Sequence, residues 1–95
     1  MELHQLAESV SDEKSFLAFV DALRRDRELA ASAENASLAD RYGPERGWEN
    51  VTIESFLEAA HAWAEDTDFG ARQDLREASP WRKFAIFLYC GKIYE

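Results

Sequence analysis

The chain has 95 residues, 46% of them hydrophobic and 13% aromatic, and its formal net charge is −8. This length fits one α-helical domain over residues 1–95, and the hydrophobic content argues against intrinsic disorder. The 19 acidic residues outnumber the 11 Lys and Arg residues, which argues against an ordinary nucleic-acid-binding protein, because such proteins need a cationic surface.

The cysteine content and the apolar runs indicate where the protein resides. Cys90 is the single cysteine, so no intramolecular disulfide can form, and this fits a reducing compartment. Residues 1–4 lack a basic n-region and no apolar h-region follows, so we expect no secretion signal. The longest apolar run has seven residues, Phe84 to Cys90, far fewer than the ~20 that span a bilayer. We therefore expect a cytoplasmic protein without membrane contact.

Two helices are expected in the N-terminal third. Residues 2–10 carry apolar positions with helical spacing at Leu3, Leu6, Ala7 and Val10. Ser11 is the expected N-cap of a longer helix over residues 12–31, with acidic residues in its first turn. The apolar stripe of this helix consists of Phe16, Phe19, Val20 and Leu23.

The middle of the chain combines an uncertain segment with a clear helix. Residues 32–47 are rich in alanine and polar residues, and we expect a weak helix followed by a loop. Thr52 is then a good N-cap, and Val51 is placed to pack on Phe56 as a hydrophobic staple. The helix is expected to end near Asp66, and its predicted core face consists of Ile53, Phe56, Leu57, Ala60, Trp63 and Ala64.

The C-terminal segment is the most hydrophobic part of the chain. Ser79 suits an N-cap, Pro80 suits the first helical position, and Gly91 suits a left-handed C-cap. The aromatic content also allows a hairpin that turns at residues 90–91, but the start and stop signals favour a helix. Because this helix is apolar nearly all round, we expect an all-α bundle of four to five helices with the C-terminal helix at its centre.

The second half of the chain contains two tryptophan motifs and a characteristic ending: Trp48, Glu49 and Asn50, then Trp81, Phe84 and Ala85, and finally Tyr94 and Glu95. With these residues the chain resembles a family of small bacterial proteins of unknown function. The resemblance covers roughly residues 10–95. It implies an α-helical cytosolic bacterial protein and brings no activity with it.

The clearest candidate for function is an acidic stripe on the helix after Thr52. No Lys or Arg occurs from Gly47 to Ala71, so this stripe could bind a basic protein, although a merely solvated face has the same pattern. Trp48 either plugs the end of the bundle or offers a contact surface. The candidate partner-binding residues are Glu54, Glu58, His61 and Glu65 on the stripe, with Asp66, Asp68, Trp48 and Glu49 beside it.

Metal binding is the alternative use of the same stripe. Glu58 and His61 have the Glu-x-x-His spacing of di-iron bundles, and Glu65 lies one turn further on. Such a site needs a second Glu-x-x-His pair, and the other histidine, His4, has no acid three residues before it. We therefore assign no metal ligand and no cofactor, and keep a metal-binding protein or enzyme as the alternative.

Catalytic signatures are lacking in the sequence. It contains no glycine-rich phosphate loop, no Cys/His zinc spacing and no local signature of a Ser–His–acid triad. We expect a non-enzymatic interaction module with a basic protein partner, for example a toxin-neutralising immunity protein. An acidic mimic of nucleic acid is a further alternative, and the oligomeric state stays open.

Overall fold

The computed structural model of the protein describes residues 2–33, 48–73 and 75–94. They form α1 (Leu3–Glu8), α2 (Glu13–Ala33), α4 (Ile53–Thr67), the 3-10 helix η1 (Ala71–Gln73) and α5 (Pro80–Ile93), and none of these residues forms a strand. The predicted all-α fold is confirmed, and the C-terminal hairpin is excluded. Apart from the end of α2, the segment predicted as a weak helix and loop (32–47) lies outside the described residues.

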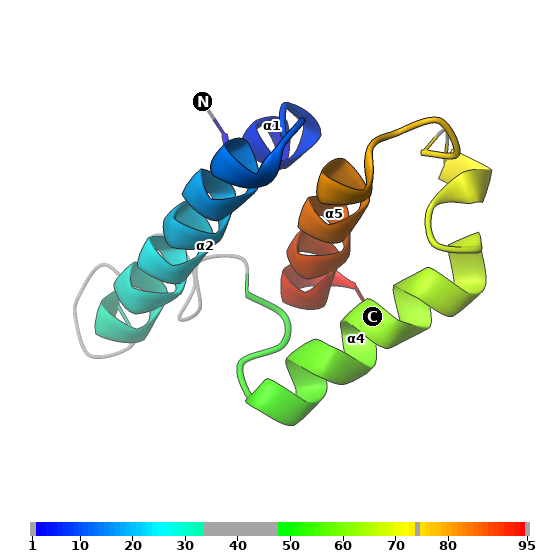
Figure 1. The fold of residues 1–95 in the computed structure, drawn as a ribbon. Coiled ribbons are helices and arrows are strands. Elements are labelled where there is room, and N and C mark those ends of the chain that lie inside the picture. Colours follow the sequence, from blue (N-terminus) through cyan, green and yellow to red (C-terminus); the bar gives the residue numbers. More distant parts are fainter. Residues whose placement is uncertain (1, 34–47, 74, 95) are drawn as a thin grey trace.

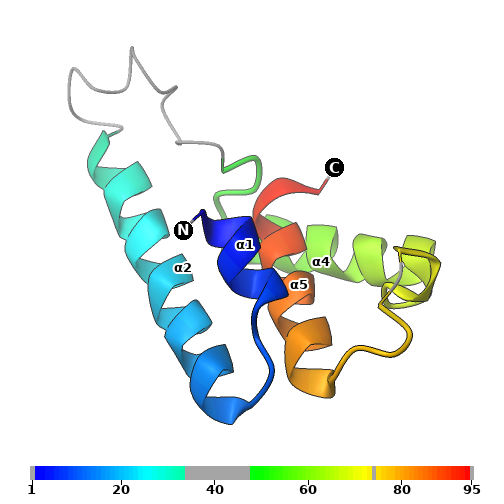
Figure 2. The same ribbon diagram turned by 90° about the horizontal axis from the view of Figure 1, so that it is seen from above.

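The C-terminal helix α5 lies at the centre of the fold, as predicted. It packs against α1, α2 and α4. Figure 1 shows α5 between α2 and α4, and Figure 2 shows α4 crossing behind α5 with α1 in front. The helix is not enclosed on every side, because Phe84 is 47% exposed. Within the described ranges, no helix has both the length and the hydrophobicity needed to cross a bilayer.

The N-cap of α2 is Asp12 and not Ser11, which corrects the prediction. The Asp12 carboxylate accepts a hydrogen bond from the Ser15 backbone N–H (2.8 Å), and the Asp12 N–H donates to the Ser15 hydroxyl (3.0 Å). The hydrogen bonds from Ser15 also lower the pKa of Asp12. Ser11 and Asp12 are both suitable N-cap residues. Asp12 takes the position because Ser15, three residues later, both donates to the Asp12 side chain and accepts from the Asp12 backbone, which completes a capping box.

Helix α4 begins as predicted. The Thr52 hydroxyl oxygen accepts a hydrogen bond from the Ser55 N–H (3.1 Å), which satisfies one of the free donors of the first turn. The helix ends at Thr67, and Asp68 follows in the left-handed conformation with φ of 54°. Phe69, also at positive φ, stacks its ring on Phe87 of α5 at 5.4 Å between centroids. This contact fixes the turn against the central helix.

Helix α5 begins at Pro80 with Ser79 as its N-cap, as predicted, but Gly91 is not its C-cap. The helix continues to Ile93, and Gly91 lies inside it facing α4. A Cβ atom built on Gly91 would lie 2.7 Å from the ring of Phe56. The glycine is thus needed for the close approach of α4 to α5, and the prediction of a left-handed cap is wrong.

The predicted core face of α4 is only partly buried. Ala60 and Trp63 are 0% and 1% exposed, as expected, whereas Ile53 is 78% and Leu57 54% exposed. The reason is the position of α4 on α5: the side that carries Phe56, Ala60 and Trp63 faces α5, and the edge with Ile53 and Leu57 faces the space toward α2. The prediction of these two residues as core is wrong.

Candidate protein-binding face

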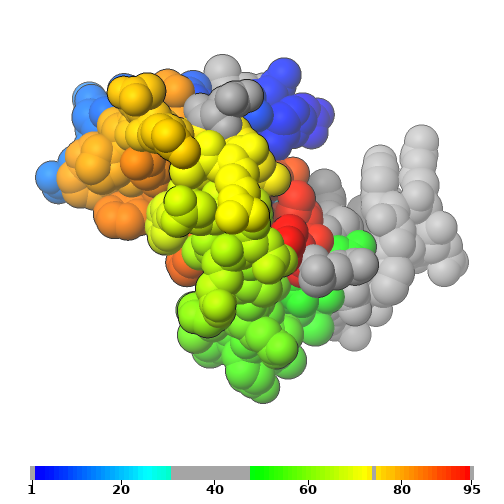
Figure 3. All heavy atoms as spheres, turned by 90° about the vertical axis from the view of Figure 1, so that its right-hand side faces the viewer, coloured from blue at the N-terminus to red at the C-terminus, as the bar shows by residue number. Residues whose placement is uncertain are grey.

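All four residues of the predicted acidic stripe are exposed on α4. Glu54, Glu58, His61 and Glu65 follow one another at helical spacing along the side of α4 that faces solvent. Figure 3 shows α4, coloured yellow-green to green, as a ridge on one face of the molecule. We call this surface the acidic face of α4. Its side chains are directly accessible to another protein.

Among the residues that the structure describes, no Lys or Arg forms an ion pair with the acidic face. His61 Nδ1 lies 2.8 Å from Glu65 Oε1. Glu54 and Glu58 form no ion pair with any residue that the structure describes. On α2, by contrast, the Arg24 guanidinium pairs with carboxylates three residues before it and four residues after it. The carboxylates Glu54 and Glu58 therefore leave negative charge on the surface of α4, whereas on α2 Arg24 neutralises the carboxylates beside it.

The two acids after the stripe differ in their surroundings. The Tyr94 hydroxyl donates a hydrogen bond to Asp66 Oδ2, which raises the pKa of Tyr94 and ties the end of α4 to the C-terminal residues. Asp68 is exposed in the left-handed turn. Asp68 therefore extends the acidic face beyond the helix, and Asp66 also serves a structural role.

Trp48 plugs the end of the bundle. The side chain is 5% exposed, and its indole N–H donates to Asp26 Oδ2 at 2.8 Å. Lys92 Nζ and the Arg27 guanidinium carbon each lie 5.5 Å from the centre of the Trp48 ring system, within the range of cation–π attraction. The indole is thus largely buried, as expected for a plug at the end of the bundle.

The two residues after Trp48 hold the C-terminal end of α5. The Glu49 backbone N–H donates to the Lys92 carbonyl (2.9 Å), and Asn50 Nδ2 donates to the carbonyls of Gly91 (3.1 Å) and Tyr94 (2.9 Å). Carbonyls at a helix end have no partner within the helix, so these bonds satisfy them. The Trp-Glu-Asn motif thus has a structural explanation, and Glu49 is its one exposed residue.

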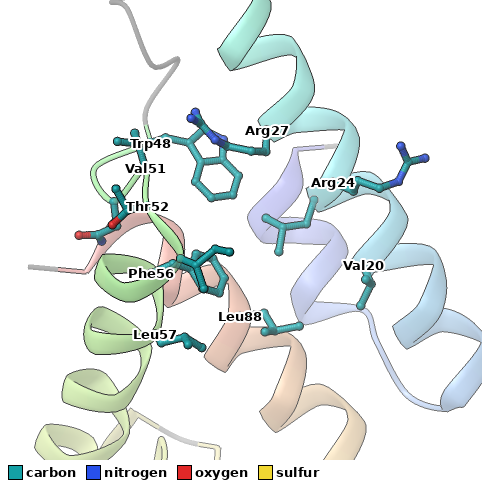
Figure 4. Close-up of a pocket in the computed structure, with 12 residues that line it drawn as sticks. Val20, Arg24, Arg27, Trp48, Val51, Thr52, Phe56, Leu57 and Leu88 are labelled. Atoms are coloured by element: carbon teal, nitrogen blue, oxygen red, sulfur yellow. The ribbon is translucent and has the colours of Figure 1, made fainter.

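Sequence reasoning missed an apolar groove beside the acidic face. It has a volume of about 480 Å³ and lies between α2 and α4, with α5 as its floor. Figure 4 shows Val20 projecting from α2, Phe56 and Leu57 from α4, and Leu88 from α5. We call it the α2–α4 groove. The sequence signal was present, because Ile53 and Leu57 belong to the apolar stripe, but the pattern assigned them to the core.

Two observations concern the candidate metal ligands and the single thiol. In the described part of the chain, no group of three His, Cys, Asp or Glu side chains is placed to hold a metal ion. Glu58, His61 and Glu65 therefore do not form a group of three ligands in this structure. Burial raises the pKa of the Cys90 thiol to about 11, so the thiolate that nucleophilic chemistry needs is scarce near neutral pH.

These observations define a small α-helical protein built around a C-terminal central helix, with one strongly acidic helix face. The chain belongs to the family of unknown function DUF7660, which matches residues 12–95. The match begins after α1 and agrees with the resemblance predicted from the sequence. No curated protein and no solved structure matches the chain.

Proposed function

We propose that this protein is a non-enzymatic interaction module that binds a basic protein through the acidic face of α4. The observation that carries the proposal is the exposure of Glu54 and Glu58 without an ion-pair partner among the described residues. Glu65 and Asp68 extend the same negative surface. A cationic protein would supply the missing charges.

Charge complementarity of this kind acts mainly on association. Opposite potentials steer the encounter of two proteins and suppress wrong partners, and this effect falls steeply as salt rises. Complexes of this kind therefore form quickly at low ionic strength. Their final affinity depends on apolar contacts in the centre of the interface.

A toxin-neutralising immunity protein in the bacterial cytoplasm is the concrete form that we favour. Small acidic proteins without catalytic groups suit this role, because covering a basic active site requires only a complementary surface. The step from an acidic surface to this class is an analogy. An acidic mimic that blocks a nucleic-acid-binding protein would use the same surface, and the identity of the captured partner separates the two forms.

The proposal is tested by capturing partner proteins from a bacterial lysate on immobilised protein. At low and at high salt, the wild-type protein is compared with a variant carrying Glu54→Gln, Glu58→Gln and Glu65→Gln. The control carries Glu8→Gln, Glu13→Gln and Glu77→Gln, which change the net charge equally at exposed positions away from α4. We expect a basic protein that wild type and control retain at low salt and that the α4 variant loses. Equal retention by both variants would refute the proposal.

A further inference from the structure

The α2–α4 groove has the form of a binding site for a helix. Its walls are two helices, α2 with Val20 and Leu23 and α4 with Phe56 and Leu57, and its floor is Leu88 of α5. It is open along one side and holds about 480 Å³, which is room for several large side chains. Amphipathic helices bind grooves of this shape with apolar residues at successive turns.

Three large apolar side chains of the groove, one just before α4 and two on it, are exposed to solvent. Val51, Ile53 and Leu57 are 40%, 78% and 54% exposed. Single exposed apolar side chains are common on protein surfaces, but a contiguous group indicates an interaction site. Covering this group would remove apolar area from water, which favours binding. A partner seated in the groove would therefore gain affinity that the acidic face alone does not provide.

The charges beside the groove are asymmetric. Glu54 and Glu58 each follow an apolar wall residue by one position, which places them about 100° further round α4, on the outer edge of this wall. On the opposite wall, Arg24 pairs with carboxylates of α2, and Arg27, which also lines the groove, has its guanidinium carbon 5.5 Å from the centre of the Trp48 ring. A helix in the groove therefore gains most from cationic side chains on its edge toward α4.

We propose that the α2–α4 groove binds an amphipathic helix of a partner protein, whose apolar stripe enters the groove and whose Lys or Arg residues lie over Glu54 and Glu58. This inference rests on the proposed function and specifies the part of the basic partner that docks. A second copy of this chain fits less well. Its own most exposed apolar helix edge, with Ile53 and Leu57, carries the same two carboxylates beside it, so like charges would meet.

Two synthetic peptides test the inference directly. Both have about 15 residues, enough for partial helix formation, and share one leucine stripe; one has lysines and the other glutamates along the same edge. Binding is followed by fluorescence anisotropy of labelled peptide at low salt. We expect the lysine peptide to bind the wild-type protein at least about tenfold more tightly than the glutamate peptide. If the lysine peptide does not bind, or both bind equally, the inference is wrong.

Matched variants locate the binding. Leu57→Asn changes the groove wall, and Leu29→Asn is its control, because Leu29 on α2 is 53% exposed and does not line the groove. We expect Leu57→Asn to weaken binding of the lysine peptide about tenfold or more and Leu29→Asn to leave it unchanged. Equal effects of the two variants would overturn the inference. Circular dichroism confirms that each variant is folded.

The same variants separate the groove from the acidic face. If Leu57→Asn leaves capture of the basic partner intact while the glutamine variant of α4 abolishes it, the proposed function stands and the groove inference fails. If Leu57→Asn abolishes capture and the glutamine variant does not, the partner binds in the groove without needing the glutamates of α4. The proposed function then fails. If the wild-type protein is a dimer and the Leu57→Asn variant is a monomer, the groove binds a second copy of this chain. That result would overturn the inference.

Discussion

Lys92 of α5 donates a hydrogen bond to the Asp26 carboxylate of α2 across a 2.8 Å gap, and both side chains are largely removed from water. The same carboxylate oxygen accepts the Trp48 indole N–H. One acid thus joins the central helix, the longest described helix and the segment that leads into α4. The pair has a cost as well as a gain, because two charges are desolvated to form it.

Replacement of Lys92 by Met is expected to destabilise the fold by about 2 kcal/mol, because it leaves the Asp26 carboxylate without its cation in a partly buried site. Asp26→Asn combined with Lys92→Met should recover part of this loss, since no unpaired charge remains. Urea denaturation of both single variants and the double variant measures the coupling. Strictly additive effects would show that the pair is not coupled.

The ion pairs of Arg24 on the surface of α2 provide the comparison for this experiment. Arg24→Met removes two pairs, with Asp21 and Glu28, whose side chains are about half exposed. Its expected cost is below about 1 kcal/mol, because solvent screens exposed pairs. A cost as large as that of Lys92→Met would show that burial does not make the Lys92–Asp26 pair stronger than the surface pairs of Arg24.

Gly91→Ala is expected to destabilise the protein, although alanine is the better helix former. The new methyl group would lie 2.7 Å from the Phe56 ring, and overpacking of this kind costs about 1–3 kcal/mol, more than the roughly 1 kcal/mol gained in helix propensity. In a Phe56→Leu background the same substitution should be neutral or stabilising. Thermal unfolding of the wild type, Gly91→Ala, Phe56→Leu and the double variant checks this reversal. A stabilising effect of Gly91→Ala in the wild-type background would contradict it.

Asn50→Ala should cost about 1–2 kcal/mol, because two carbonyls at the end of α5 lose their donor. Asn50→Asp should be worse at neutral pH, since a carboxylate would face carbonyl oxygens and have a raised pKa. Its extra penalty should disappear as pH falls below about 4, where the carboxyl group takes up a proton and can donate it. Denaturation midpoints of the two variants at pH 7 and pH 3.5 measure the difference. A constant difference would show that Asn50 does not act through these carbonyls.

Burial raises the pKa of the Cys90 thiol to about 11 from an ordinary value of 9.0. The unfolded chain therefore loses this proton at lower pH than the folded chain, and the Cys90 contribution to stability, complete below pH 9, should decline between pH 9 and 11. Cys90→Ala should remove this part of the alkaline destabilisation. Urea denaturation at pH 8, 9.5 and 11 tests the prediction, which fails if both proteins lose stability equally.

The sequence was sufficient to predict the helices whose ends carry strong local signals. Thr52 before α4 and the Ser79–Pro80 pair before α5 act through bonds within a few residues, so local pattern determines them. The central position of α5 also followed from its composition. Local pattern was less decisive where two capping residues adjoin, as at Ser11 and Asp12.

The other errors concern contacts between residues that are far apart in the sequence. Periodicity indicates which side of a helix is apolar, but not how much of that side a neighbouring helix covers, and Ile53 and Leu57 were therefore assigned to the core. Lys92 gave no signal of burial, because its partner Asp26 lies 66 residues away. The apolar stripe of α4 contained the residues of the α2–α4 groove, but the groove itself depends on how α2 and α4 are placed around α5.

The most direct test of the central claim is a carboxyl footprint of the complex with the captured basic protein. Free and bound protein are labelled with a carbodiimide and an amine, and modification of each acidic residue is quantified by mass spectrometry. We predict strong protection of Glu54 and Glu58 on binding, with Glu8 and Glu13 labelled equally in both states. Unchanged labelling of Glu54 and Glu58 in the complex would contradict binding through the acidic face of α4.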